Sequence, residues 1–137
     1  MSEVVLSNPF KAKDIAAKSG FAEVAKDTTW QIKEFGFWVL VKPKGKDTQY
    51  FFTKPETNDS NNHITLTLKV PVGFIVAAFC HTHPKSDNVG DFGGDDLSHF
   101  KEARKKNPTI VFYLMNQTGQ IRLAESEKDF PKGRAIP

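Results

Sequence analysis

Two histidines follow directly on an unbroken apolar run. Residues 74–80 read Phe-Ile-Val-Ala-Ala-Phe-Cys, and His81 and His83 come next. Such a run, bounded by the turn residues 71–73, is typical of a strand covered on both faces. Because side chains alternate along a strand, both imidazoles project from one face while Thr82 points the other way. Two imidazoles at the end of a rigid strand suit a divalent transition metal such as zinc, which then requires a third ligand.

A second motif follows after a polar loop, where residues 92–97 read Phe-Gly-Gly-Asp-Asp-Leu. The order of His-x-His, a spacer and an aspartate resembles the metal signature of the JAMM (MPN-type) metallopeptidases, in which the spacer ends in Ser-x-x-Asp. The resemblance implies that Asp96 is the third zinc ligand. It also places Gly93 at the family's serine, whose hydroxyl helps to stabilise the oxyanion. Gly93 offers only a backbone N–H, and neither Ser86 nor Ser98 has the spacing to replace the serine, which predicts an activity that is low or absent.

The resemblance extends to an early strand, because the family takes its general acid/base from a glutamate and Glu34-Phe35-Gly36-Phe37 opens such a strand here. On its own, Glu34 is more often a solvated charge at a strand edge. The chain is most similar to the JAB-like toxin domains of polymorphic Rhs-type proteins, over residues 14–100. This implies a hydrolase, a Zn²⁺-dependent metalloprotease that cleaves a peptide or isopeptide bond, acting as a bacterial toxin or effector module. A cognate immunity protein or a larger delivery protein would be its partner.

Three other interpretations compete with a peptidase. A zinc nucleoside deaminase needs a Cys-x-x-Cys pair, which the single cysteine, Cys80, cannot supply. A catalytically impaired metal-binding scaffold or interaction module is the closest rival, because Gly93 replaces the motif serine. The third is a metal-free core, in which histidines are hydrogen-bonded and aspartates cap a helix. The presence of both histidines, Asp96 and Glu34 favours the enzyme over the scaffold, and the joint spacing of the motifs favours it over the metal-free core.

Composition limits the class of protein. The 137 residues, 39% of them hydrophobic and twelve of them phenylalanine, predict one domain over 1–137 with a substantial core. A net charge of +3 is too weak to indicate nucleic acid as a partner. Neither a signal peptide nor an apolar run long enough to span a membrane is present in the sequence. We therefore expect a soluble protein, cytoplasmic or delivered into a target cell by a secretion system.

The remaining pattern supplies the elements that must position the site. Ser7-Asn8-Pro9 is a helix start, and Gly36 indicates a bulge or a close backbone approach within the early strand. Asp95 is expected to cap the second helix, leaving Asp96 free for a metal. His63 and His99 are expected to be surface or packing residues. The pattern predicts helices over 9–26 and from 95 to about 106, strands over 30–41, 48–53, 64–70, 74–80, 109–115 and 120–124, a polar loop over 54–63 and a loosely packed tail over 125–137.

This order predicts an α+β fold, a mixed β-sheet flanked by helices. The JAMM resemblance implies the same arrangement, the cytidine-deaminase-like architecture of that family.

Overall fold

The structure, a computed structural model, describes residues 5–43, 45–57, 70–83 and 92–136. It is an α+β fold built on a mixed sheet of seven strands. The elements are, in chain order, α1 (Lys13–Ala25), β1 (Phe35–Lys42), β2 (Gln49–Phe52), β3 (Glu56–Thr57), β4 (Ile75–Thr82), α2 (Gly94–Lys106), β5 (Val111–Met115), β6 (Ile121–Ala124), the short 3-10 helix η2 (Glu127–Asp129) and β7 (Arg134–Ala135).

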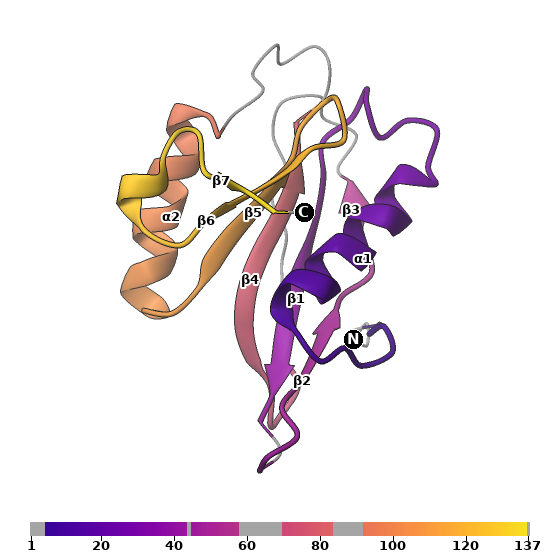
Figure 1. The fold of residues 1–137 in the computed structure, drawn as a ribbon, viewed down its shortest axis with the longest axis vertical. Helices are drawn as coiled ribbons and strands as arrows, with labels where there is room; N and C mark the ends of the chain where they lie inside the picture. The colour runs from indigo at the N-terminus through magenta and orange to yellow at the C-terminus, as the bar shows by residue number, and fades with distance from the viewer. Residues whose placement is uncertain (1–4, 44, 58–69, 84–91, 137) are drawn as a thin grey trace.

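The strands are arranged in the order β2-β1-β4-β5-β6-β7, and β3 also pairs with β1. β4 and β5 are parallel, whereas the other pairs are antiparallel. The parallel pair lies at the centre of the sheet, with α2 as the connection between its strands, as a parallel pair requires. Figure 1 shows α2 beside β6 and η2, and α1 running along β1.

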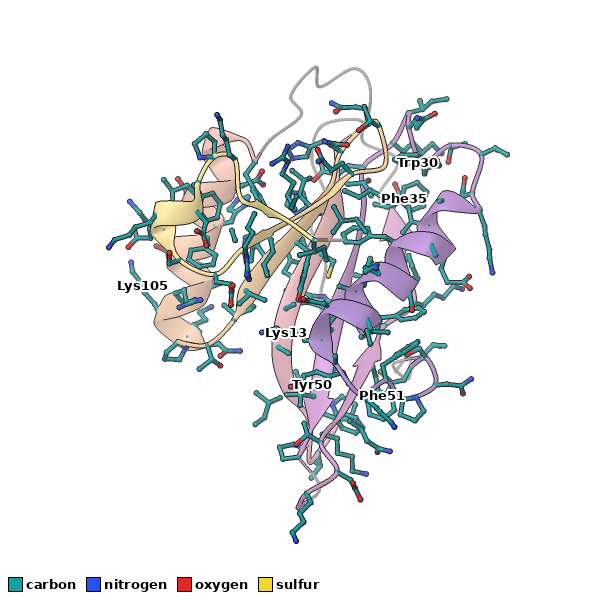
Figure 2. All side chains as sticks on the ribbon, viewed as in Figure 1. Lys13, Trp30, Phe35, Tyr50, Phe51 and Lys105 are labelled. Atoms are coloured by element: carbon teal, nitrogen blue, oxygen red, sulfur yellow. The ribbon has the colours of Figure 1, made fainter. Side chains whose placement is uncertain are left out.

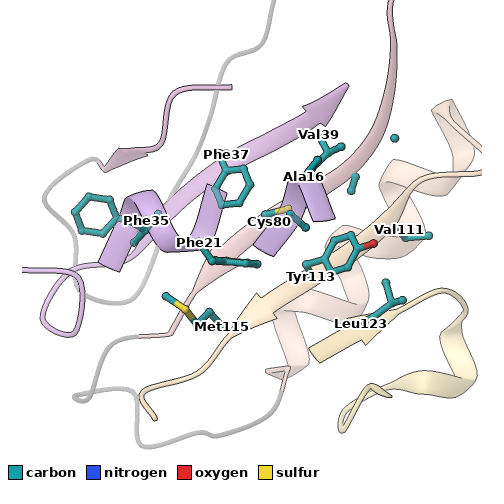
Figure 3. Close-up of a cluster of buried hydrophobic side chains, with 14 residues drawn as sticks. Ala16, Phe21, Phe35, Phe37, Val39, Cys80, Val111, Tyr113, Met115 and Leu123 are labelled. Atoms are coloured by element: carbon teal, nitrogen blue, oxygen red, sulfur yellow. The ribbon is translucent and has the colours of Figure 1, made fainter. Parts of the chain in front are cut away.

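Each helix packs on its own side of the sheet, which explains the continuous apolar character of β4 and β5. Alternate residues of β5 enter two separate clusters, with Tyr113 on the α1 side and Phe112 and Leu114 on the α2 side. The α1 cluster is drawn in Figure 3, where Phe21 of α1 lies close to Phe37 and Cys80 of the strands. Cys80 is fully buried there, and burial raises the pKa of its thiol well above the ordinary value.

Glycine at position 20 allows α1 to lie close to the sheet. A Cβ at Gly20 would stand 2.3 Å from Cε2 of Phe37, so the aromatic ring occupies the space of a side chain. α1 runs unbroken through Ser19 and Gly20, although a glycine can interrupt a helix.

The start of the first helix is also corrected. It begins at Lys13 and not at residue 9, and its N-cap residue, Ala12, makes no side-chain capping bond. The predicted cap residue Ser7 pairs instead with β2, because its N–H donates to the carbonyl of Phe52 at 2.9 Å and Phe10 bridges to Tyr50. These contacts join residues about forty positions apart, so local pattern does not reveal them.

The first strand is shorter than predicted. Residues 30–33 form a turn, in which the N–H groups of Ile32 and Lys33 both donate to the carbonyl of Thr29 at 2.9 Å. The predicted polar loop contains the short strand β3, and its remainder, with His63, lies outside the described residues, as does nearly all of the strand predicted over 64–70. The turn before β4 is confirmed, with Gly73 at a φ of 90°.

The C-terminal segment is better packed than the predicted loose tail. It contains η2 and β7, which pairs with β6. Phe130 lies 5.0 Å from Phe92 and 5.1 Å from Phe100, measured between ring centroids. The aromatic contacts hold this segment on the α2 side of the sheet. Within the described part of the chain, neither α-helix is long and apolar enough to cross a membrane.

Candidate metal centre

The site lies at the end of the sheet where β4 finishes and β1 begins. Figure 2 labels Phe35 at this end and Tyr50 and Phe51 at the other. His81 is the last residue but one of β4, and His83 is the first residue after the strand. Their exposed fractions are only 1% and 4%, so two polar rings are buried side by side with centroids 5.1 Å apart.

A β-bulge determines which face carries the imidazoles. Ala77 is an extra residue on β4, because the residues on either side of it pair with consecutive residues of β1. Ala77 and Ala78 consequently both pack toward α1, and alternation resumes at Phe79, which packs toward α2. His81 and His83 follow in step with Phe79, and so they lie on the α2 side. Gly36 pairs regularly with His81, so of the two alternatives predicted for this glycine the bulge is wrong, and the close backbone approach stays a prediction.

Asp96 meets both histidines from the first turn of α2. Its Oδ1 lies 3.0 Å from Nε2 of His81, and its Oδ2 lies 3.2 Å from Nε2 of His83. One potential ligand atom from each of the three residues lies within 4.8 Å of the others. The structure thus brings together the three residues that the sequence motifs single out for a metal.

The carboxylate of Asp96 is strongly biased toward its ionised form. Burial raises the pKa of Asp96, but the charge of His81 and the hydrogen bonds from both imidazoles outweigh burial and hold the pKa well below its ordinary value. A buried carboxylate facing two imidazole nitrogens is the electrostatic environment that a divalent cation requires.

Aromatic rings fix the orientation of His81. The ring of Phe79 stacks on it at 5.4 Å with an interplanar angle of 12°, and Phe92 lies 6.1 Å away. On the opposite face, the hydroxyl of Thr82 accepts the backbone N–H of Phe35 at 2.9 Å, which ties the start of β1 to the end of β4. Apolar packing and this cross-strand bond leave the imidazoles little freedom to turn.

The cap of α2 differs from the prediction. The N-cap position is Gly93, not Asp95, and the first helical residue is Gly94. The backbone N–H of Gly93 donates to Oδ2 of Asp96 at 2.7 Å. Asp96 therefore caps the N-terminus of α2 and contacts both histidines with the same carboxylate. The prediction assigned the cap to Asp95 and the metal to Asp96.

This arrangement bears on the oxyanion position. In the absence of the motif serine, the backbone N–H of Gly93 was the donor expected to face an oxyanion. It donates instead to the carboxylate of Asp96. Ser98 is exposed on α2, and Ser86 lies outside the described residues. His99 is likewise exposed, as predicted.

Glu34 immediately precedes β1 and is only 7% exposed. Its carbonyl accepts a hydrogen bond from the hydroxyl of Thr57 at 2.8 Å, so the backbone here is held by β3. Gly36 pairs with His81, and continuing that antiparallel register by two residues places Glu34 opposite His83 on the same face. Glu34 is thus buried and is not the solvated edge charge of the alternative interpretation. Its place beside His83 follows from the extended register alone, and its catalytic role stays a prediction.

Polar residues of β5 and β6 that the sequence pattern did not single out share this face. Leu114 pairs with both His81 and Arg122, so Arg122 is two strands away from His81 in the same row. Asn116, which is 5% exposed, follows two residues after Leu114. The pairing of two strands that are distant in sequence would have been needed to recognise either residue.

Comparison with known proteins does not identify a family for this chain. The chain matches no protein-family model, no curated protein and no solved structure. The class that the geometry itself defines is an α+β protein with a buried His-His-Asp cluster able to hold a metal ion.

Proposed function

We propose that this chain is a zinc-dependent hydrolase of peptide or isopeptide bonds, similar to the JAMM metallopeptidases. The observation that carries the proposal is the convergence of two buried Nε2 atoms on the two oxygens of one ionised carboxylate. A buried cluster of this kind is costly to maintain without a function, since each polar group must be withdrawn from water.

The donor set fits zinc. Tetrahedral zinc with ligand bonds of about 2.0–2.2 Å separates its ligand atoms by about 3.3–3.5 Å. The nitrogen–oxygen distances of 3.0 and 3.2 Å lie just below this range, and one ligand atom from each residue lies within 4.8 Å of the others, so the donors are close enough to share one ion. Within the part of the chain that the structure describes, two imidazoles and one carboxylate make three ligands, and three protein ligands with an open fourth position are typical of a catalytic zinc site.

The chain's own residues then take defined roles. When bound, zinc supplies a Lewis acid that polarises a carbonyl and lowers the pKa of water. Glu34 accepts the proton of the attacking water and passes it to the nitrogen of the leaving amine. His81, His83 and Asp96 would hold the ion, each with one ligand atom, and the ring of Phe79 keeps His81 in place.

A metal-binding scaffold is the second candidate, and one observation favours it. The hydroxyl of the motif serine is absent, and the N–H of Gly93 is committed to Asp96. A scaffold would bind zinc but would not need the buried carboxylate of Glu34. Substitution of Glu34 therefore separates the two candidates.

The resemblance to toxin domains supports a role as an effector module that acts on a protein or peptide substrate. An immunity protein that blocks the site, or a larger protein that delivers the domain, would be the partner in that role.

The proposal is tested by the metal content of the protein purified without added metal. We expect about one zinc ion per chain, and loss of nearly all of it in His83→Ala. His99→Ala is the matched control, because it removes an exposed histidine of α2 and should retain the metal. Circular dichroism spectra would verify that each variant folds. Wild-type protein that remains free of zinc after incubation with the ion would refute the proposal.

A further inference from the structure

A pocket of about 590 Å³ lies beside the C-terminal half of α2. A volume of this size is typical of a small-molecule binding site. Its wall combines apolar surface with three cations and one anion. The residues that supply these groups are Phe100, Lys101, Arg104 and Lys105 of α2, Pro108 after the helix, and Glu127 of η2.

The pocket is separate from the metal cluster. Arg104 follows Asp96 by eight residues of α2, which corresponds to about 12 Å along an α-helix. Figure 2 labels Lys105 on α2, away from Phe35 at the end of the sheet where the cluster lies. A small ligand in this pocket would therefore not contact the metal cluster.

Arg104 is the fixed cation of the pocket. Its half-buried side chain donates from Nε to the carbonyl of Ile110 at 2.6 Å and from Nη2 to the carbonyl of Glu125. Its Cζ lies 4.7 Å from the ring centroid of Phe100. Contacts from three separate segments thus hold the guanidinium in one orientation.

These contacts leave the charge of Arg104 without a counter-ion. Both acceptors are neutral carbonyls, and among the described residues no carboxylate forms an ion pair with Arg104. A guanidinium has five N–H donors, of which the two bonds use two. Cations in the last turn of a helix commonly interact with its C-terminal carbonyls, but Arg104 donates to carbonyls outside α2.

The two lysines of the pocket are mobile cations beside this fixed one. Nζ of Lys101 lies 3.5 Å from Oε1 of Glu127, and their side chains are 54% and 63% exposed. Nζ of Lys105 lies 2.9 Å from Oε1 of Glu102, and both side chains are at least 70% exposed. Exposed ion pairs of this kind contribute little, so either ammonium group can exchange its carboxylate for a ligand.

We infer that this pocket binds an organic phosphate, a phosphate group attached to an apolar group. The lining carries three positive charges and one negative charge, and a phosphate monoester carries a charge of about −1.5 to −2 at pH 7. Its three terminal oxygens match one guanidinium and two ammonium groups. Phe100 and Pro108 supply the apolar contact. The site goes beyond the proposed hydrolase and does not rest on it.

The experiment is an NMR titration of the protein as purified, at low ionic strength. The probes are phenyl phosphate, inorganic phosphate, phenol and the peptide acetyl-Ala-phosphotyrosine-Ala-amide. We expect phenyl phosphate to shift the backbone amide signals of Arg104 and Lys105, and to bind more tightly than inorganic phosphate or phenol. Tighter binding of the peptide than of phenyl phosphate would identify a phosphorylated side chain as the source, and the reverse would identify a small molecule.

Substitutions of the lysines test the cations without disturbing the core. Lys101→Gln and Lys105→Gln should each lower the affinity for phenyl phosphate by roughly threefold to tenfold. Lys106→Gln is the matched control, because it removes the same charge from an exposed position of the same helix that does not line the pocket. Arg104→Gln should give the largest loss, and the lysine variants preserve the test if it folds poorly.

Glu127→Gln gives a change of the opposite sign. It removes the negative charge of the lining and releases Lys101, so the affinity for phenyl phosphate should rise severalfold. A gain of this kind cannot result from a poorly folded variant.

An equal loss of affinity in Lys106→Gln and in the two pocket lysine variants would overturn the inference, because it would show only a general effect of charge. Phenyl phosphate that binds no more tightly than phenol would also overturn it. Signal changes confined to His83 and its neighbours would do the same, since they would place the phosphate at the metal cluster.

Discussion

Replacement of Gly93 by serine tests the geometry of the helix start and the missing oxyanion donor together. Gly93 has φ and ψ of −80° and 171°, which any residue adopts. A Cβ there would meet only Oδ2 of Asp96, at 3.7 Å, an ordinary van der Waals contact. The substitution thus introduces a hydroxyl at the N-cap, beside the metal cluster, without strain.

The expected gain in stability follows from two effects. Serine is a better N-cap than glycine by a few tenths of a kcal/mol, because its hydroxyl can accept a backbone N–H of the first turn. Loss of glycine flexibility in the unfolded chain adds about 0.4–1 kcal/mol. Gly93→Ser should therefore raise the free energy of unfolding by roughly 0.5–1.5 kcal/mol, or about 2–6 °C in melting temperature.

The second expectation concerns catalysis. One oxyanion donor is worth about 10²–10³ in kcat, so hydrolysis of an amide substrate by the zinc-loaded protein should rise by up to that factor. Activity would be followed with a fluorogenic peptide library, with Glu34→Gln in the Gly93→Ser background as the blank.

Gly119→Ser is the control for the same chemical change at a different backbone conformation. Gly119 has a φ of 86° and open space around it, so a serine there is strained and should destabilise by about 1–2 kcal/mol. A fall in melting temperature for Gly93→Ser similar to that of Gly119→Ser would refute the described helix start. A stabilised Gly93→Ser protein without increased hydrolysis would refute the oxyanion role alone.

Three further predictions concern single side chains. Glu34→Gln should leave zinc content unchanged and lower amide hydrolysis by roughly two to four orders of magnitude, and full activity in kinetic assays would remove Glu34 from the mechanism. Asp96→Ala should abolish zinc binding, and it should also lower the free energy of unfolding of the metal-free protein by about 0.5–2 kcal/mol because the cap of α2 is lost. Asp95→Ala should keep the metal. Elemental analysis and urea denaturation would measure the two effects, and equal loss of metal in both variants would contradict the prediction. Gly20→Ala should destabilise by about 1–3 kcal/mol in thermal melts, because its methyl group would displace the ring of Phe37, and a neutral result would show that α1 does not lie as described.

Local pattern was sufficient for much of the site. The shared face of His81 and His83 follows from a two-residue period, and the structure confirms it. The apolar run predicts a buried strand, which is confirmed toward the histidines, whereas Ile75 at the start of β4 is 50% exposed. The seven-strand mixed sheet agrees with the predicted α+β class.

The errors arise where contacts distant in sequence decide the conformation. Ser7 has a side chain that commonly caps helices, but its backbone N–H donates to the carbonyl of Phe52 in β2. Asp95 and Asp96 are chemically identical, and the positions of the histidines and of the N–H of Gly93 select Asp96 as metal-ligand candidate and helix cap. The position of Arg122 in the same row as His81 could not be predicted, because it depends on the order of the strands in the sheet, which sequence periodicity does not reveal.

Because of the bulge at Ala77, the face on which His81 and His83 lie depends on whether the number of residues between the bulge and His81 is odd or even. Insertion or deletion of one residue between Val76 and His81 would exchange the two faces of the strand end, presenting Cys80 and Thr82 to Asp96 and sending the imidazoles into the apolar layer under α1. A length change of two residues would preserve the parity but shift the pair along the sheet. Related chains that retain this cluster should therefore vary in length within the connecting loops and keep the distance from bulge to histidines constant.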